Sequence, residues 1–178
     1  TALTWALYYL AKNPDAQDNL RKEVLEIFSD CNHFPTFDEI ESLKYLECVF
    51  KEILRIIPPY EIMNGYTVPK GTPLVIPIYA IHHDPSIWGD DAKYFNPSRW
   101  LNPEIKARVT NCNFLPFGAG PRNCLGMKLA HLEVKTILAI IIRNLKFRLV
   151  EGFTFETITS GFSKPHPRMD LFVSKVDY

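Results

Sequence analysis

The feature that most constrains this chain is a ten-residue stretch from Phe117 to Gly126, FGAGPRNCLG, which runs directly into an apolar segment. From Leu125 to Leu145, apolar residues recur at the spacing of one helix face, so the sequence predicts a helix there. Cys124 is therefore expected at or just before a helix N-terminus. Unpaired backbone N–H groups and the positive end of the helix dipole favour a thiolate at such a place.

Other residues of this stretch have separate physical roles. Gly118 and Gly120 suit a loop whose backbone takes positive φ, or lies flat against a ligand where a Cβ atom would collide. Arg122 supplies a permanent cation with forked donors, which suits a carboxylate partner such as a propionate. Phe117 is placed to shield the cysteine sulfur from water. Together these residues indicate a loop that holds a ligand beside one thiol.

The stretch resembles the FGxGxRxCxG signature of the cytochrome P-450 family, with every fixed position filled. The resemblance implies that Cys124 is the axial ligand of a haem iron, where its thiolate favours O–O cleavage. The cofactor-binding residues that it implies are Cys124, Arg122, Phe117, Gly118, Gly120 and Gly126. The other cysteines, which are Cys31, Cys48 and Cys112, match no ligand position.

Two further segments carry the same resemblance. Glu52 and Arg55 lie three apart, and therefore on one helix face, in a pattern that resembles the family's ExxR motif. The segment from Phe95 to Trp100 resembles the one that adds a second arginine, here Arg99. The resemblance implies a charge network of Glu52, Arg55 and Arg99 that holds the cysteine loop in place. If the network is buried, removing one member leaves an unpaired charge at roughly 3–5 kcal/mol.

Local patterns predict a mainly α fold with a small β portion, and the resemblance implies that this is the C-terminal part of the cytochrome P-450 fold. Helices are expected up to Asn13, from an Asn13 N-cap and Pro14 to about Phe28, and from about Glu41 to Ile57 after a capping box at Thr36 and Glu39. Strands are expected as a hairpin over Gly65–Ile76, at His82–His83, and as a terminal pair over Leu145–Val150 and Leu171–Val176. The segment from Asn102 to Phe114 is expected to be an irregular loop.

Composition narrows the class of protein. The 178 residues are 47% hydrophobic and 22% charged, which is typical of a globular chain. Lys+Arg and Asp+Glu number 20 each, which argues against a nucleic-acid partner. No segment is predicted to span a membrane. Because the chain opens on an apolar helical pattern at Thr1 with no cap before it, we expect it to begin inside a helix. The resemblance implies that residues 1–178 are the C-terminal part of a single cytochrome P-450 domain whose N-terminal half is absent.

For the complete enzyme, the resemblance implies a haem b (iron protoporphyrin IX) monooxygenase that inserts one atom of O2 into a small apolar organic substrate. Electrons would come from NADPH through a flavoprotein reductase, on the cytosolic face of the endoplasmic reticulum membrane. Lys128 and Lys135, with Arg122, could offer cations to an acidic electron donor. The family's acid–alcohol pair lies upstream of Thr1, so no catalytic residue is assigned.

The sequence departs from the family pattern between Pro59 and Gly65. The family usually has a longer segment there, with an arginine for a haem propionate and side chains that line the substrate pocket. Arg122 is then the remaining propionate partner, and the sequence predicts weakened haem retention.

Alternative functions stay open at this point. A haem-binding chain without chemistry, a family member that rearranges peroxides and a structural helical module without haem are three of them. A zinc site built from Cys112, Cys124, His131 and the pair His82 and His83 is another. However, seven residues of helix separate Cys124 from His131 by about 10.5 Å, too far for both to bind one ion directly.

Overall fold

The computed structural model describes residues 2–28, 33–56, 76–160 and 162–176, apart from a few side chains that include Arg122. The helices are α1 (Ala2–Lys12), α2 (Pro14–Ile27), α3 (Phe37–Ser42), α4 (Lys44–Ile56), α5 (Ile78–His82), α6 (Pro85–Trp88), α7 (Pro103–Arg108) and α8 (Met127–Asn144), with 3-10 turns η1 (Pro97–Leu101) and η2 (Gly120–Arg122). The strands are β1 (Leu145–Leu149), β2 (Glu156–Ser160), β3 (Phe162–His166) and β4 (Leu171–Lys175). A mainly α fold with a small β portion is thus confirmed. The expected hairpin over 65–76 and the short segment 59–65 lie at least largely outside the described residues.

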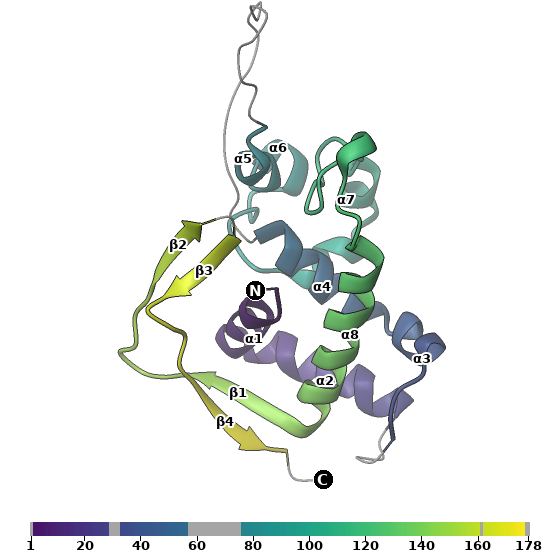
Figure 1. The fold of residues 1–178 in the computed structure, drawn as a ribbon. Helices are drawn as coiled ribbons and strands as arrows, with labels where there is room; N and C mark the ends of the chain where they lie inside the picture. The colour runs from purple at the N-terminus through teal and green to yellow at the C-terminus, as the bar shows by residue number, and fades with distance from the viewer. Residues whose placement is uncertain (1, 29–32, 57–75, 161, 177–178) are drawn as a thin grey trace, which may run out of the picture.

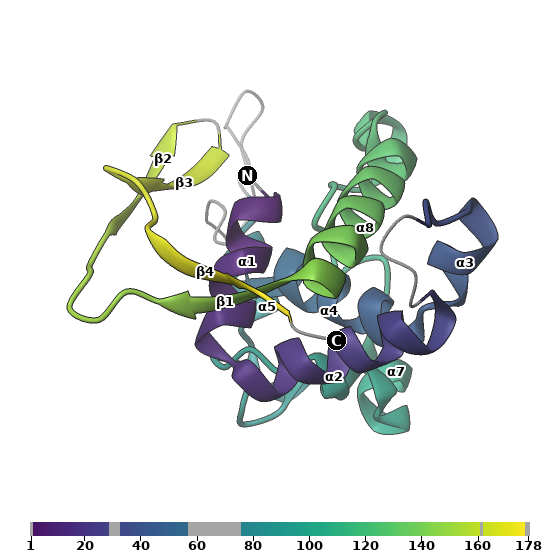
Figure 2. The same ribbon diagram turned by 90° about the horizontal axis from the view of Figure 1, so that it is seen from below.

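The core is helical and is formed by elements far apart in the sequence. Helices α1, α2, α4 and α8 pack around one apolar cluster in which Leu10, Leu20, Val49 and Leu138 are fully buried. Figure 1 shows α8 crossing beside α2 and α4, and Figure 2 shows the β2–β3 hairpin on the other side of α1 from α8. This arrangement places the start of α8 at one end of the core.

The strands form two separate antiparallel pairs. Strands β1 and β4 pair from Leu145 opposite Lys175 to Leu149 opposite Leu171, which confirms the expected terminal pair. The β2–β3 hairpin was not expected from the sequence. It is joined to the helical core by a hydrogen bond of 3.0 Å from the Trp5 indole N–H to the Ser163 carbonyl oxygen.

Helix boundaries near the N-terminus follow the local signals, with one exception. Helix α1 ends at Lys12 and α2 begins at Pro14, as expected. Asn13 occupies the N-cap position, but its side chain does not cap α2. Its amide instead donates to the Tyr9 carbonyl oxygen at 2.7 Å, and thereby satisfies the last turn of α1.

The helix expected from about Glu41 to Ile57 is present as α4, but it begins later, at Lys44, and the capping box does not start it. The capping box instead starts the short helix α3, which ends at Ser42 and is followed by Leu43 in an extended conformation. Helix α4 then begins separately, and the carboxylate of Glu23, on α2, accepts hydrogen bonds from the N–H groups of Tyr45 and Leu46. A cap supplied by another helix therefore allows the chain to break between α3 and α4.

Two other expectations are corrected. The segment from Asn102 to Phe114 contains helix α7, because the Asn102 side chain accepts from the Glu104 N–H at 2.9 Å and Pro103 starts the helix. His82 ends a short helix rather than lying on a strand. None of the described helices combines the length and apolar character that a membrane span requires.

Candidate functional site

Cys124 lies in a loop immediately before α8. Its thiol is free and exposed, and its backbone N–H donates to the Phe117 carbonyl oxygen at 2.9 Å, which closes the loop on itself. Gly118 and Gly120 have φ of 72° and 76°, a conformation that disfavours residues with a Cβ atom. The backbone at Gly126 is ordinary, and a Cβ atom there would lie 4.0 Å from Cys124 Sγ. The glycines thus shape the turn and leave space beside the sulfur.

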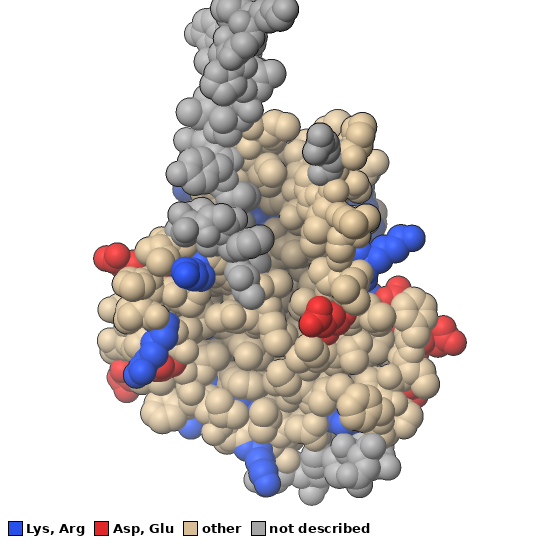
Figure 3. Space-filling view, in the orientation of Figure 1, with Lys and Arg blue, Asp and Glu red and all other residues tan. Residues whose placement is uncertain are grey.

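The surface next to the thiol is apolar. Leu125 is fully exposed and Leu129 is 67% exposed, whereas Leu138 and Ile142 in the second half of α8 are fully buried. The apolar helix pattern is confirmed, but the leucines at its start, Leu125 and Leu129, stay largely exposed. Uncharged side chains cover most of the face in Figure 3, and charged ones are few and scattered.

Phe117 is anchored to the core through a neighbouring ring. Its ring centroid lies 5.3 Å from that of His131 on α8, which in turn lies 4.7 Å from the fully buried Phe50 on α4. Burial lowers the pKa of His131, so the imidazole between the two phenyl rings is neutral near pH 7. These contacts fix one end of the cysteine loop, while shielding of the sulfur by Phe117 stays a prediction.

Glu52, Arg55 and Arg99 come together in a buried cluster. Glu52 and Arg55 are fully buried, and Arg55 donates to both carboxylate oxygens, at 2.8 Å to Oε2 and 2.7 Å to Oε1. Arg99 Nε donates to Oε1 at 3.0 Å, and the Trp100 indole N–H donates to Oε2 at 3.1 Å. One carboxylate therefore joins α4 to the 3-10 turn η1.

The two arginines also bind backbone carbonyl groups. Arg55 donates to the carbonyl oxygens of His82 and Ala92 at 2.6 Å, and Arg99 donates to that of Trp88 at 2.6 Å. Among the described residues, none of the cluster's hydrogen bonds reaches the loop from Phe117 to Gly126 directly. The cluster instead holds α5, α6 and the segment after them.

A histidine that the sequence did not single out for this role joins that region to the approach to the cysteine loop. His82 is fully buried, and its Nε2 accepts a hydrogen bond of 2.9 Å from the N–H of Leu115. Burial lowers the pKa of His82 to about 4. The adjacent His83 contacts the Tyr79 carbonyl oxygen through Nδ1 at 2.9 Å.

The lysines expected to offer positive charge to an electron donor differ in exposure. Lys128 is exposed, but Lys135 is buried and forms ion pairs with Glu41 and Glu47. The prediction that Lys135 offers a free cation to an electron donor is therefore wrong, because two carboxylates already neutralise its charge. The side chain of Arg122 lies outside the described part of the structure.

A zinc site receives no support. Within the described ranges, no group of three His, Cys, Asp or Glu residues is placed to hold a metal ion. Cys31 lies outside those ranges.

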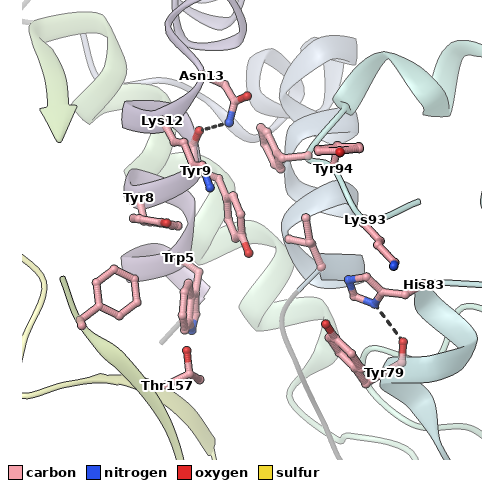
Figure 4. A pocket seen from close by; sticks show the side chains of 13 residues that line it. Trp5, Tyr8, Tyr9, Lys12, Asn13, Tyr79, His83, Lys93, Tyr94 and Thr157 are labelled. Carbon is pink, nitrogen blue, oxygen red and sulfur yellow. Dashed lines mark hydrogen bonds between the residues drawn. The ribbon is translucent and has the colours of Figure 1, made fainter. Parts of the chain in front are cut away.

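The described cavities do not include the cysteine. A cavity of about 320 Å³ lies between α1, α5 and β2, and is lined largely by aromatic side chains such as Trp5, Tyr9 and Tyr94. Figure 4 shows Trp5 and Tyr9, on α1, across the space from His83 and Tyr79, with Tyr94 on the same side as His83. A second cavity, of about 550 Å³, lies beside Met127 and Leu129 on α8.

The residues around Cys124 fit a thiolate-ligated haem. A haem of this kind needs one protein sulfur, an apolar surface for the ring and a backbone that does not obstruct it. The exposed thiol, the uncovered side chains of Leu125 and Leu129 and the open space beside Gly120 meet these needs, since a Cβ atom at Gly120 would contact nothing within 4 Å.

Comparisons with known proteins agree with this chemistry. The model of the cytochrome P-450 family matches residues 1–173. The chain is 35% identical to cytochrome P-450 72A397 of Kalopanax septemlobus and 35% identical to a cytokinin hydroxylase of Arabidopsis thaliana, covering 98% of this chain and 35% of each relative. It is also 35% identical to secologanin synthase 1 of Catharanthus roseus, over 88% of this chain and 32% of that protein. The chain thus spans about a third of the length of these relatives, and it belongs to the cytochrome P-450 family.

Proposed function

We propose that this chain provides the haem-thiolate site of a cytochrome P-450 monooxygenase, with Cys124 as the axial ligand of haem b. The observation that carries the proposal is the free, exposed thiol of Cys124 beside uncovered apolar side chains at the start of α8. Its loop is closed by the hydrogen bond from the Cys124 N–H to the Phe117 carbonyl oxygen. A sulfur held in this way is oriented before any ligand binds.

Each residue of the site would contribute separately. Haem supplies the iron that binds and activates O2 when it is present. Cys124 holds the iron through its thiolate, and Phe117 limits access of water to the sulfur. Leu125 and Leu129 give the ring an apolar surface, whose burial stabilises binding in proportion to its area. Arg122 would pair with a propionate group.

The buried cluster would have a structural role in this function. Glu52, Arg55 and Arg99 lie away from solvent and bind one another and backbone carbonyl groups, so they are not placed to exchange protons or electrons with a substrate. Gly118, Gly120 and Gly126 would let the loop lie close to the ring. We propose that residues 1–178 form the C-terminal part of a single domain.

For the whole protein we propose insertion of one oxygen atom into a small apolar organic substrate. Electrons would come from NADPH through a flavoprotein reductase, at the cytosolic face of the endoplasmic reticulum membrane. Membership of the family supports the reaction class, and the relatives include a protein named as a hydroxylase.

Reconstitution with haem tests the proposal. The purified 178-residue chain is incubated with haem, reduced and exposed to carbon monoxide, and its Soret band is recorded. Cys124→Ala is the test variant, and Cys112→Ala is the matched control because it removes another exposed free thiol. We expect the long-wavelength thiolate-type band in the wild-type chain and in Cys112→Ala, and its loss in Cys124→Ala.

Two results would contradict the proposal. If the wild-type chain retains no haem, the alternative of a structural helical module without haem is favoured. A spectrum that is the same with and without Cys124 shows another iron ligand. Haem binding through Cys124 without substrate oxidation in a protein of full family length would leave the site intact and refute the monooxygenase step.

A further inference from the structure

The cysteine loop has to be held in a defined position relative to the helical core if the Cys124 sulfur is to bind an iron atom. The buried cluster around Glu52 is rigid but does not bond to that loop directly among the described residues. The contacts that lead from one to the other therefore determine how firmly the thiol is placed.

A continuous series of hydrogen bonds joins them. Arg55 bonds to Glu52 at 2.7 Å and to the His82 carbonyl oxygen at 2.6 Å, and His82 Nε2 accepts from the Leu115 N–H at 2.9 Å. The Leu115 carbonyl oxygen then accepts from the Gly118 N–H at 3.1 Å, at the first turn of the cysteine loop. His82 is the member of this series whose side chain joins α5 to Leu115, on the approach to the cysteine loop.

The imidazole of His82 must be neutral to make its bond. Because the Leu115 N–H is a donor, Nε2 has to be the unprotonated nitrogen, and the proton lies on Nδ1. The pKa of His82, lowered to about 4 by burial and by the charge of Arg55 and the neighbouring His83, is consistent with this state at neutral pH.

Burial of this ring is not explained by packing alone. His82 packs against Trp88 and Phe114, with ring centroids 6.3 Å and 5.5 Å away. Its Nδ1 has no hydrogen-bond partner among the described residues, which is unfavourable for a fully buried polar atom. An apolar side chain would fill the same space without that penalty, so the useful property of His82 is the acceptor at Nε2.

We propose that His82 is a positioning residue of the haem-thiolate site, which couples the Glu52–Arg55 cluster to the cysteine loop through its bond to the Leu115 N–H. The inference rests on the proposed function for its effect on haem, but the bond itself exists without haem. His82 acts through Leu115 and does not touch the reacting atoms.

Two substitutions separate the acceptor from the bulk of the ring. His82→Leu removes the acceptor, whereas His82→Gln can return an oxygen acceptor near the position of Nε2. The matched controls are His83→Leu and His83→Gln, because His83 is the next residue and its side chain bonds to Tyr79 rather than to the loop. Only variants that keep the wild-type far-UV circular dichroism are compared.

The first measurement needs no haem. Amide hydrogen exchange of Leu115, followed by NMR, is expected to become roughly tenfold faster in His82→Leu and to return towards the wild-type rate in His82→Gln. Both His83 variants are expected to keep the wild-type rate at Leu115. Equal exchange in the two His82 variants, or no change in His82→Leu, would overturn the proposal even if the chain never binds haem.

The second measurement uses the haem-loaded chain. The fraction of haem with the thiolate-type spectrum is expected to fall in His82→Leu and to recover in His82→Gln. A purely structural role would lower the unfolding midpoint in both variants and leave the spectrum of the folded protein unchanged, which would contradict the proposal. If the wild-type chain itself retains no haem, the proposed function fails, while the exchange measurement still decides the role of His82.

Discussion

Replacing Glu52 with glutamine removes the negative charge that Arg55 and Arg99 share and keeps the size of the side chain. Oε2 accepts from Arg55 Nε at 2.8 Å and from the Trp100 indole N–H at 3.1 Å. Oε1 accepts from Arg55 Nη2 at 2.7 Å, the Asn96 N–H at 2.9 Å and Arg99 Nε at 3.0 Å. Whichever way the amide turns, its NH2 group therefore faces at least two donors.

The expected loss of stability follows from these contacts. Hydrogen bonds to charged groups contribute about 1.5–3 kcal/mol each, and the substitution disrupts at least two of them. Arg55 is fully buried, so water cannot replace the lost partner. Breaking a buried ion pair by changing one partner costs about 3–5 kcal/mol, and we expect the free energy of unfolding of Glu52→Gln to fall by about that amount.

Urea titration followed by tryptophan fluorescence measures this loss, since Trp88 lies against Arg55 and Trp100 donates to Glu52. Glu104→Gln is the matched control, because Glu104 is 79% exposed and lies 3.8 Å from Arg108. The control is expected to change stability by less than about 0.5 kcal/mol. A loss below about 1 kcal/mol in Glu52→Gln would refute the reasoning that the cluster excludes water and that both arginines depend on the Glu52 carboxylate.

Two further predictions concern the loop and the first short helix. Gly120→Ala is expected to lower the free energy of unfolding by about 1 kcal/mol. The cause is backbone strain at φ 76° alone, because a Cβ atom there meets nothing within 4 Å. A urea midpoint unchanged from the wild type would contradict this. Hydrogen bonds, first from the backbone N–H of Thr36 and then from His33, lower the pKa of Glu39 from 4.5 to about 2. The ionised carboxylate therefore stabilises the fold above pH 4.5, and this contribution is lost as the pH falls towards 2. Thermal unfolding against pH should show that decline in the wild type and not in Glu39→Gln, and parallel curves for the two proteins would argue against it.

The cysteine loop could be predicted because its signals are local. Positive φ at Gly118 and Gly120 and the start of a helix just after Cys124 depend on residues within a few positions of one another. The capping box of Thr36 and Glu39 is local in the same sense. Such features need no knowledge of the rest of the fold.

Helix boundaries were missed where the deciding contact comes from another element. The break at Leu43 depends on the carboxylate of Glu23, which lies on α2 and binds N–H groups at the start of α4. Helix α5 replaces an expected strand because Arg55 and the Trp88 indole N–H bind the carbonyl oxygens of its last residues. No window of sequence around either segment contains these partners.

The sequence by itself determined that a lone cysteine precedes an apolar helix after a glycine-containing turn, and that Glu52 and Arg55 share a helix face. Spacing along one chain is sufficient for both, because the helix period is constant. Only the tertiary structure decided that this ion pair is buried with Arg99, that Lys135 is already paired, and that His82 binds the approach to the cysteine loop. Burial and these partnerships join residues tens of positions apart, and they exist only after α4, α5, α8 and η1 have packed together.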